Sequence, residues 1–178
     1  MSDVIELHEG SSPVILSAPH VGTELPEAVR ARLNERGLAL DDTDWHVHRL
    51  YDDLLPTATR VTARYSRYVV DLNRPPGGGS LYPGQNTTGT CPTTDFDGEA
   101  IYRDGQAPDE DEIAERVATY HAPYHAAIEA QIARLREKHG AVLLYDCHSI
   151  RSVVPYLFEG ELPVLNIGTN EGATCDAA

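Results

Sequence analysis

The chain has 178 residues and carries 14 Lys and Arg against 28 Asp and Glu, a formal net charge of −14. This balance argues against nucleic-acid binding, which rests on Lys and Arg contacts to phosphates, and the length suits a single domain spanning residues 1–178. The first residues lack a signal-peptide pattern, no apolar run reaches the roughly 18 residues that cross a bilayer, and the cysteines form no CxxC pair, so we expect a cytoplasmic protein without membrane contact.

The first half of the chain predicts strands and helices in alternation. Strands are expected at 13–18, 59–63 and 68–72, and helices at 27–36 and 41–55. The first strand leads directly to His20. Gly37 is the expected stop of the first helix, and Asp42 or Thr43 is the candidate N-cap of the second.

The second half contains a long irregular segment and a long helix. Residues 75–108 are rich in Pro, Gly and Thr without periodicity, which predicts a loop folded over a site. Apolar residues near helical spacing predict a helix over 109–139, and Pro123 predicts a kink within it. Residues 164–167 are a candidate last strand.

Residues 141–149 are the centre of the predicted fold. An apolar run at 141–145 ends abruptly in the polar stretch 146–149, a pattern typical of a fully buried strand. The alternating elements predict an α/β fold with a mixed, mainly parallel sheet flanked by helices in three layers. Because the chain stops soon after its last predicted strand, with no helix to cover that strand, we expect an incomplete domain.

Two histidines at predicted strand ends suggest a metal site. A catalytic zinc ion takes about three His, Asp or Glu ligands and keeps one position open for water. His20 and His148 are the first candidates, since ligands bind at the carboxyl ends of strands in open α/β sheets. Asp44 and His46 are candidates for the third ligand, and Glu24 is a weaker one. The alternative is that each histidine is a hydrogen-bonded residue at a strand end.

A second pair of histidines lies on the predicted long helix. His121 and His125 have the i, i+4 spacing of helical zinc ligands. However, Ala122 stands where such motifs carry a catalytic Glu, and Pro123 lies between the two histidines. We therefore favour a structural role on the helix face.

Four arginines lie at or near predicted strand ends in this acidic chain. They are Arg64, Arg67, Arg74 and Arg151. Planar guanidinium groups bind carboxylates with two parallel hydrogen bonds, so a site with a metal and arginines suits a small anionic substrate. The alternative is structural ion pairing with acids such as Asp71 and Asp146.

Taken together, several segments resemble the N-formylglutamate amidohydrolase family. They are Ser-Ala-Pro-His-Val-Gly at 17–22, Asp-Thr-Asp-Trp-His at 42–46, Leu-Tyr-Asp at 50–52, residues 65–75 with Asp-Leu-Asn-Arg, Asp-Cys-His-Ser-Ile-Arg-Ser at 146–152, and Leu-Asn-Ile-Gly-Thr at 165–169. The resemblance implies hydrolysis of N-formyl-L-glutamate to formate and L-glutamate, a step of histidine degradation. It also implies a fold similar to the zinc carboxypeptidases, of the phosphorylase/hydrolase-like kind.

The same resemblance implies roles for individual residues. His20 and His148 would bind the metal, which we expect to be Zn²⁺ or another divalent ion, and Asn73 and Arg74 would hold a substrate carboxylate. The zinc carboxypeptidases take an acidic ligand from His-x-x-Glu, but Thr23 occupies that position here. We therefore assign the third ligand to Asp44, with His46 as the rival.

Further residues complete the expected site. Arg67 and Arg151 are expected to clamp the substrate carboxylates, and Asp146 and Ser149 to orient a metal ligand. Family members continue beyond residue 178 into a Glu-bearing strand, so the general base is expected there. The alternatives are another zinc amidohydrolase or carboxypeptidase-like hydrolase for acidic N-acyl amino acids, or a catalytically inactive, ligand-binding remnant of the fold.

Overall fold

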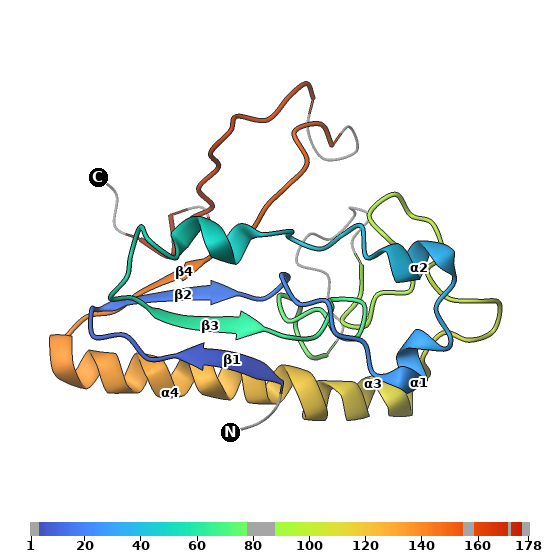
Figure 1. The fold of residues 1–178 in the computed structure, drawn as a ribbon, viewed down its shortest axis with the longest axis horizontal. Helices are drawn as coiled ribbons and strands as arrows, with labels where there is room; N and C mark the ends of the chain where they lie inside the picture. Colours follow the sequence, from blue (N-terminus) through green and yellow to red (C-terminus); the bar gives the residue numbers. More distant parts are fainter. Residues whose placement is uncertain (1–3, 78–87, 155–158, 171, 176–178) are drawn as a thin grey trace.

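The computed structural model describes residues 4–77, 88–154, 159–170 and 172–175. Within these residues one four-stranded sheet has the order β1-β3-β2-β4 (Figure 1). Its strands are β1 (Ile5–His8), β2 (Val14–Ala18), β3 (Thr59–Ala63) and β4 (Leu143–Asp146). β1 is antiparallel to β3, whereas β3, β2 and β4 are parallel. The mixed, mainly parallel sheet and the strands at 13–18 and 59–63 are confirmed.

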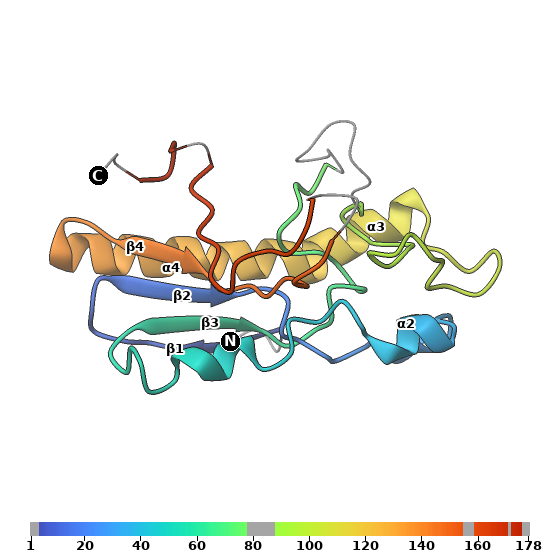
Figure 2. The same ribbon diagram turned by 90° about the horizontal axis from the view of Figure 1, so that it is seen from above.

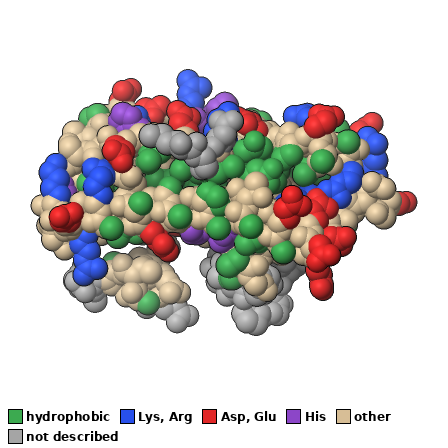
Figure 3. All heavy atoms as spheres, turned by 90° about the horizontal axis from the view of Figure 1, so that it is seen from below, with side chains coloured by type: hydrophobic (Ala, Val, Ile, Leu, Met, Phe, Trp, Pro, Cys, Tyr) green, Lys and Arg blue, Asp and Glu red, His purple; other side chains and the backbone are tan. Residues whose placement is uncertain are grey.

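A long helix packs along one face of the sheet. It consists of α3 (Glu110–Arg116), a π turn η2 (Val117–His121) and α4 (Ala122–His139). The Asp109 carboxylate accepts a hydrogen bond from the Glu112 amide and caps the N-terminus of the helix. Acidic side chains gather at this end of the molecule (Figure 3). Gly140, with φ 80°, ends the helix. The helix predicted over 109–139 is confirmed, and the π turn lies just before Pro123, where we expected a kink.

Each face of the sheet has its own core, because alternate strand residues point to opposite faces. Ile15 packs with Ile128 of α4 on one face. Leu16 packs on the other face with Val47, the first residue of the short 3-10 helix η1 (Val47–Tyr51). Figure 2 shows α4 and η1 on opposite sides of the sheet, the layered arrangement that the sequence predicted.

The helix predicted over 27–36 is wrong as a single element. The structure has two short helices there, α1 (Glu27–Arg30) and α2 (Glu35–Ala39). The side chain of Asn34 accepts a hydrogen bond from the Gly37 amide and starts α2. Gly37 therefore lies inside a helix, where its missing side chain lets the backbone approach Ile101, and does not act as the stop.

Two further predicted elements are also wrong. The segment 41–55 is helical only in η1, because His46 takes a left-handed conformation with φ 64° and interrupts the helical path. Residues 68–72 form a buried turn instead of a strand, with the amide of Asp71 bonded to the carbonyl of Thr90. Burial, which β-branched and aromatic residues also favour, explains the misleading composition of that segment.

The end of the described chain is more exposed than expected. β4 pairs only with β2 among the described residues, and Leu143 and Leu144 are 58% and 40% exposed, so the expectation of a fully buried strand is wrong. Residues 164–167 form no strand. The described parts of the segment 75–108 are irregular, as expected, and residues 78–87 lie outside the description. No helix in the described part of the chain is long and apolar enough to cross a membrane.

Candidate metal centre

Three side chains from distant parts of the sequence meet at the carboxyl edge of the sheet. His20 follows β2, Asp44 precedes η1, and His148 follows β4. Their ligand atoms all lie within 4.8 Å of one another. Asp44 Oδ2 is 3.0 Å from His148 Nδ1 and 3.7 Å from His20 Nδ1, and the two ring centres are 4.9 Å apart.

The backbone fixes this convergence. β2 and β4 are parallel neighbours with Ser17 opposite Asp146, so the residues that follow the two strands leave the sheet at the same edge. The amide of Cys147 extends the pairing with a 2.7 Å bond to the carbonyl of Ser17. The amide of Asp44 donates to the carbonyl of His20 at 2.9 Å, which fastens the third segment to the first.

Asp71 holds the ring of His20 from behind. Asp71 Oδ1 lies 2.7 Å from His20 Nε2, and Oδ2 lies 2.5 Å from a guanidinium nitrogen of Arg67. An ionised carboxylate only accepts hydrogen bonds, so His20 Nε2 carries the hydrogen and Nδ1 is left with a lone pair on the Asp44 side. Carboxylates orient the metal-binding histidines of zinc sites in this way.

Both buried carboxylates are ionised. Burial acts to raise the pKa of Asp44, but the hydrogen bond with His148 and the neighbouring His20 imidazole outweigh it and hold that pKa well below its usual range. The pKa of Asp71 is lowered in the same way, against burial, by the hydrogen bond from His20 and the positive charge of Arg67. Ser149 Oγ donates to the other oxygen of Asp44 at 3.0 Å.

The donor set fits a divalent metal ion. Two imidazoles and one carboxylate are the protein ligands of many catalytic zinc sites, which leave a fourth position open. The side chains of His20 and Asp44 are only 4% and 6% exposed, whereas that of His148 is 31% exposed. Solvent or a small molecule can therefore approach the centre from the His148 side.

Of the two residues expected to hold a substrate carboxylate, Asn73 lies beside His148 and Arg74 follows it in the chain. The side-chain amide of Asn73 is 3.4 Å from His148 Nε2. The guanidinium of the adjacent Arg74 donates to the carbonyls of Thr88 and Asn73 at 3.2 and 3.1 Å. The segment that carries Asn73 and Arg74 thus borders the open side of the centre.

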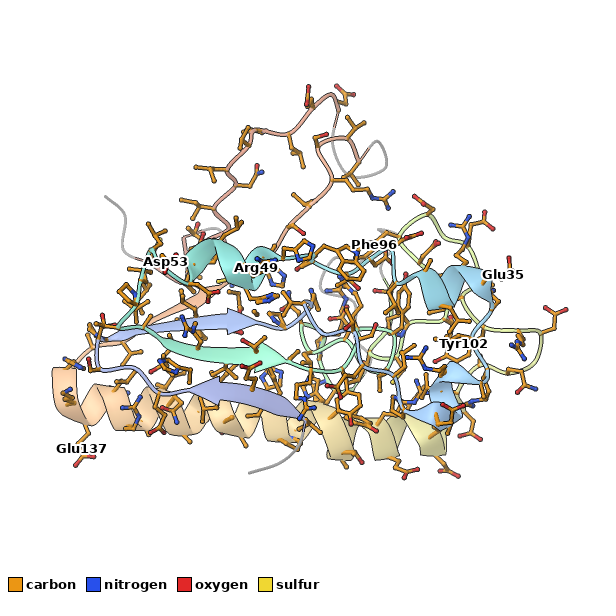
Figure 4. All side chains as sticks on the ribbon, in the orientation of Figure 1. Glu35, Arg49, Asp53, Phe96, Tyr102 and Glu137 are labelled. Carbon is orange, nitrogen blue, oxygen red and sulfur yellow. The ribbon has the colours of Figure 1, made fainter. Side chains whose placement is uncertain are left out.

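The other expected site residues are placed differently. Arg67 is 5% exposed, and its guanidinium donates to Asp71 on the side of His20 away from the centre. The guanidinium also lies 4.5 Å from the ring centre of Phe96, which is labelled in Figure 4. Arg151 is exposed and pairs with Asp97 at 2.8 Å. His46 is exposed and lies outside the ligand group.

The remaining candidates divide between neighbours of the centre and other parts of the fold. Ser149 contacts Asp44, whereas Asp146 is an exposed residue of β4 and, among the described residues, bonds to neither histidine. Glu24 forms an ion pair with Arg64 at 2.8 Å. Asp71 was not predicted as a partner of His20, although a lone carboxylate in the apolar run 68–72 indicates a buried charge that needs a partner.

Comparisons with known proteins agree with one another. The sequence model of the N-formylglutamate amidohydrolase family matches residues 12–178. An N-formylglutamate deformylase of Pseudomonas aeruginosa is 49% identical over 179 residues, which cover 100% of this chain and 67% of that protein. One of Pseudomonas putida is 46% identical over 179 residues, covering 99% of this chain and 66% of that protein. The chain thus spans about two thirds of the length of these curated relatives.

Solved structures show the same fold. An N-formylglutamate amidohydrolase from Ralstonia eutropha JMP134 matches with a TM-score of 0.68 and 23% identity, over 84% of this chain and 58% of that one. A protein of Agrobacterium tumefaciens matches with a TM-score of 0.63 and 24% identity, over 85% of this chain and 58% of that one. At these identities the likeness establishes the architecture.

Proposed function

The chain belongs to the N-formylglutamate amidohydrolase family, and we propose that it takes part in the metal-dependent hydrolysis of N-formyl-L-glutamate to formate and L-glutamate. The observation that carries this proposal is the convergence of His20, Asp44 and His148 from three separate segments. Two curated relatives that match almost the whole chain are named N-formylglutamate deformylases, which supports the choice of substrate. We place the reaction in the cytoplasm.

His20, Asp44 and His148 would hold the ion, which we propose to be Zn²⁺ because its catalytic sites use this donor set. Such an ion supplies Lewis-acid chemistry to an amide carbonyl and to water. Asp71 keeps the Nδ1 lone pair of His20 directed at the centre. Ser149 holds the Asp44 carboxylate by a hydrogen bond to its second oxygen.

Asn73 and Arg74 are the proposed contacts for a substrate carboxylate. Asn73 borders the open side of the centre and Arg74 follows it in the chain, and an amide and a guanidinium both donate hydrogen bonds to carboxylates. N-formylglutamate carries two carboxylates, so a second cation is needed in a chain with a net charge of −14, and we propose the exposed Arg151. Arg67 is assigned a supporting role through Asp71, because it is buried behind the centre.

The test combines metal analysis with product analysis. The chain is loaded with Zn²⁺, the bound metal is quantified, and formate release is followed with N-formylglutamate, N-acetylaspartate and short peptides. We expect stoichiometric zinc and slow formate release from N-formylglutamate, since no general base is assigned among residues 1–178. His20→Asn should abolish both, whereas the matched control His46→Asn, which changes an exposed histidine outside the ligand group, should preserve both.

Each other outcome would reject the proposal in a distinct way. Zinc binding with hydrolysis of N-acetylaspartate or peptides alone would indicate a different hydrolase. Zinc and L-glutamate binding without formate release would indicate a ligand-binding protein. Absence of zinc binding would remove the metal-dependent reaction altogether.

A further inference from the structure

Side chains on one face of the long helix form hydrogen bonds with the main chain of the segment 69–74. Three side chains of the helix donate hydrogen bonds to carbonyl oxygens of that segment, which passes beside the metal centre. The bonds join Arg116 Nη1 to Val69 O at 3.1 Å, His125 Nε2 to Leu72 O at 2.9 Å, and His121 Nε2 to Arg74 O at 2.9 Å. A carbonyl oxygen only accepts, so both imidazoles carry hydrogen on Nε2.

The π turn aligns these donors on one side of the helix. Arg116 and His121 are 3% and 6% exposed, so both face the interior. Residues five apart in a regular α-helix point roughly 140° away from each other. The π turn over Val117–His121 widens the helix by one residue at this point and brings the two side chains to one face. π turns are frequent at functional sites.

The segment that these donors hold carries the groups that border the centre. Asp71 Oδ1 accepts from both His20 Nε2 and the amide of Asn73, at 2.7 and 2.9 Å. The side chain of Asn73 reaches His148 at 3.4 Å. The carbonyls that accept from the two helix histidines belong to the residue before Asn73 and the residue after it. The orientation of Asn73 is therefore fixed from both sides.

We propose that His121 and His125 are positioning residues that hold Asn73 and Arg74 where they receive a substrate carboxylate, an inference that rests on the function proposed above. Their ring centres lie 4.3 Å apart with the ring planes inclined by 30°, and each Nε2 faces a carbonyl oxygen. The i, i+4 pair therefore orients the main chain next to the metal centre and is no second metal site. Neither histidine belongs to the ligand group at the centre.

The experiment uses the zinc-loaded chain and removes the donors without removing bulk. The variants are His121→Leu, His125→Leu and the double variant. His139→Leu is the matched control, because His139 lies on the same helix and also donates to a carbonyl at 2.9 Å, that of Ser11, at the far end of α4. The readouts are zinc affinity, calorimetric affinity for N-formylglutamate and L-glutamate, and amide hydrogen exchange of residues 69–77.

We expect the double variant to bind both acids about tenfold more weakly, the effect of losing one or two hydrogen bonds. Zinc affinity should change less than about twofold, since His20, Asp44 and His148 are untouched and Asp71 keeps its own bonds to Arg67 and to the carbonyl of Thr90. Amide exchange of residues 69–77 should accelerate, and His125→Gln, whose side-chain amide restores a donor, should recover part of the affinity. The control should match the unsubstituted chain in all three measurements.

The outcomes separate this inference from the proposed function. If the unsubstituted chain binds neither acid, the proposed function fails, and the exchange measurement still decides whether the histidines hold the segment. Unchanged exchange of residues 69–77 in the double variant would overturn the inference. So would acid affinity equal to that of the unsubstituted chain, or an equal loss in the His139→Leu control.

Discussion

Asp71 is completely buried, and its two oxygens face different partners, an imidazole and a guanidinium. A buried carboxylate is costly unless it is paired and hydrogen-bonded. Here the charge is compensated by Arg67 on one side, and the hydrogen bond from His20 sets the tautomer of a proposed ligand on the other. Asp71 thus contributes both to the stability of the fold, through Arg67, and to the orientation of His20 at the metal centre.

We expect Asp71→Asn to weaken zinc binding by about 10- to 100-fold, the usual cost of losing a carboxylate behind a metal-binding histidine. The amide cannot accept from His20 and Arg67 with equal strength, so His20 is no longer fixed in one tautomer. Competition with a chromogenic chelator measures the affinity. Asp97→Asn, which changes an exposed carboxylate paired with Arg151, is the control. Equal zinc affinity in both variants would show that Asp71 does not orient His20.

The residues of the centre differ in how far the sequence could identify them. His20 and His148 each follow an apolar strand, so their common edge could be predicted from the pattern alone. The choice between Asp44 and His46 could not, because it depends on the left-handed backbone at His46, which turns that side chain to the surface. Sequence periodicity carries no signal for such a conformation.

Among the helices, the first turn of α3 contains a charged junction between distant segments. Glu112 pairs with Arg116 one turn later and with Arg32 of the segment after α1. Hydrogen bonding from Arg32 is the main cause of a lowered Glu112 pKa, with Arg116 acting in the same direction and partial burial acting against both. The free energy of unfolding therefore depends on pH through this group.

Because the pKa of Glu112 is lowered in the folded chain, the ionised form adds stability above the ordinary value of 4.5, and this contribution disappears as the pH falls below that value. We expect Glu112→Gln to lower the free energy of unfolding by about 1–3 kcal/mol at pH 7 and by less at about pH 4, below the ordinary pKa, where the charge contribution has begun to fall. Urea unfolding at both pH values measures the difference. Glu110→Gln, in the same turn but exposed, is the control; a loss independent of pH would contradict the charge-based explanation.

The loop after β2 illustrates how one glycine allows two segments to approach. A Cβ on Gly22 would lie 2.3 Å from the carbonyl oxygen of Tyr65, and neither backbone can move without disturbing the other. We expect Gly22→Ala to destabilise the fold by about 1–3 kcal/mol and to weaken zinc binding, because His20 lies two residues earlier. Thermal unfolding and zinc titration test both effects.

Gly89→Ala is the matched control for that change, since a Cβ on Gly89 meets nothing within 4 Å. This variant should unfold at or slightly above the temperature of the unsubstituted chain, because alanine restricts the unfolded state more than glycine does. If Gly22→Ala and Gly89→Ala have the same unfolding temperature and the same zinc affinity, the close approach of the two loops does not constrain the fold.

Elements whose apolar residues recur with a regular helical period could be predicted from the sequence, whereas elements fixed by tertiary contacts could not. The helix over 109–139 has its cap, its periodic apolar face and its terminal glycine in the sequence. Residues 68–72 have strand-like composition, but their amides and carbonyls bond to a loop and to helix side chains instead of a neighbouring strand. A local pattern cannot reveal such partners.

Across the whole molecule, the two edges of the sheet differ in how well they are protected. β1 ends the sheet on one side and carries alternating exposed polar residues, Glu6 and His8. β4 ends it on the other side, within the described residues, with two exposed leucines in succession. An apolar edge strand is a template for pairing with another chain. The net charge of −14 opposes such contact by repulsion between copies.

We therefore expect this chain to self-associate through β4, and to do so more strongly at high salt, which screens the repulsion between acidic copies. Leu143→Lys places a charge on the edge and should reduce association across a concentration series in sedimentation velocity. Val164→Lys is the matched control, because Val164 is 99% exposed but lies outside any strand. Equal reduction by both substitutions would indicate general surface hydrophobicity, and a monomer at every concentration and salt would show that the β4 edge does not pair.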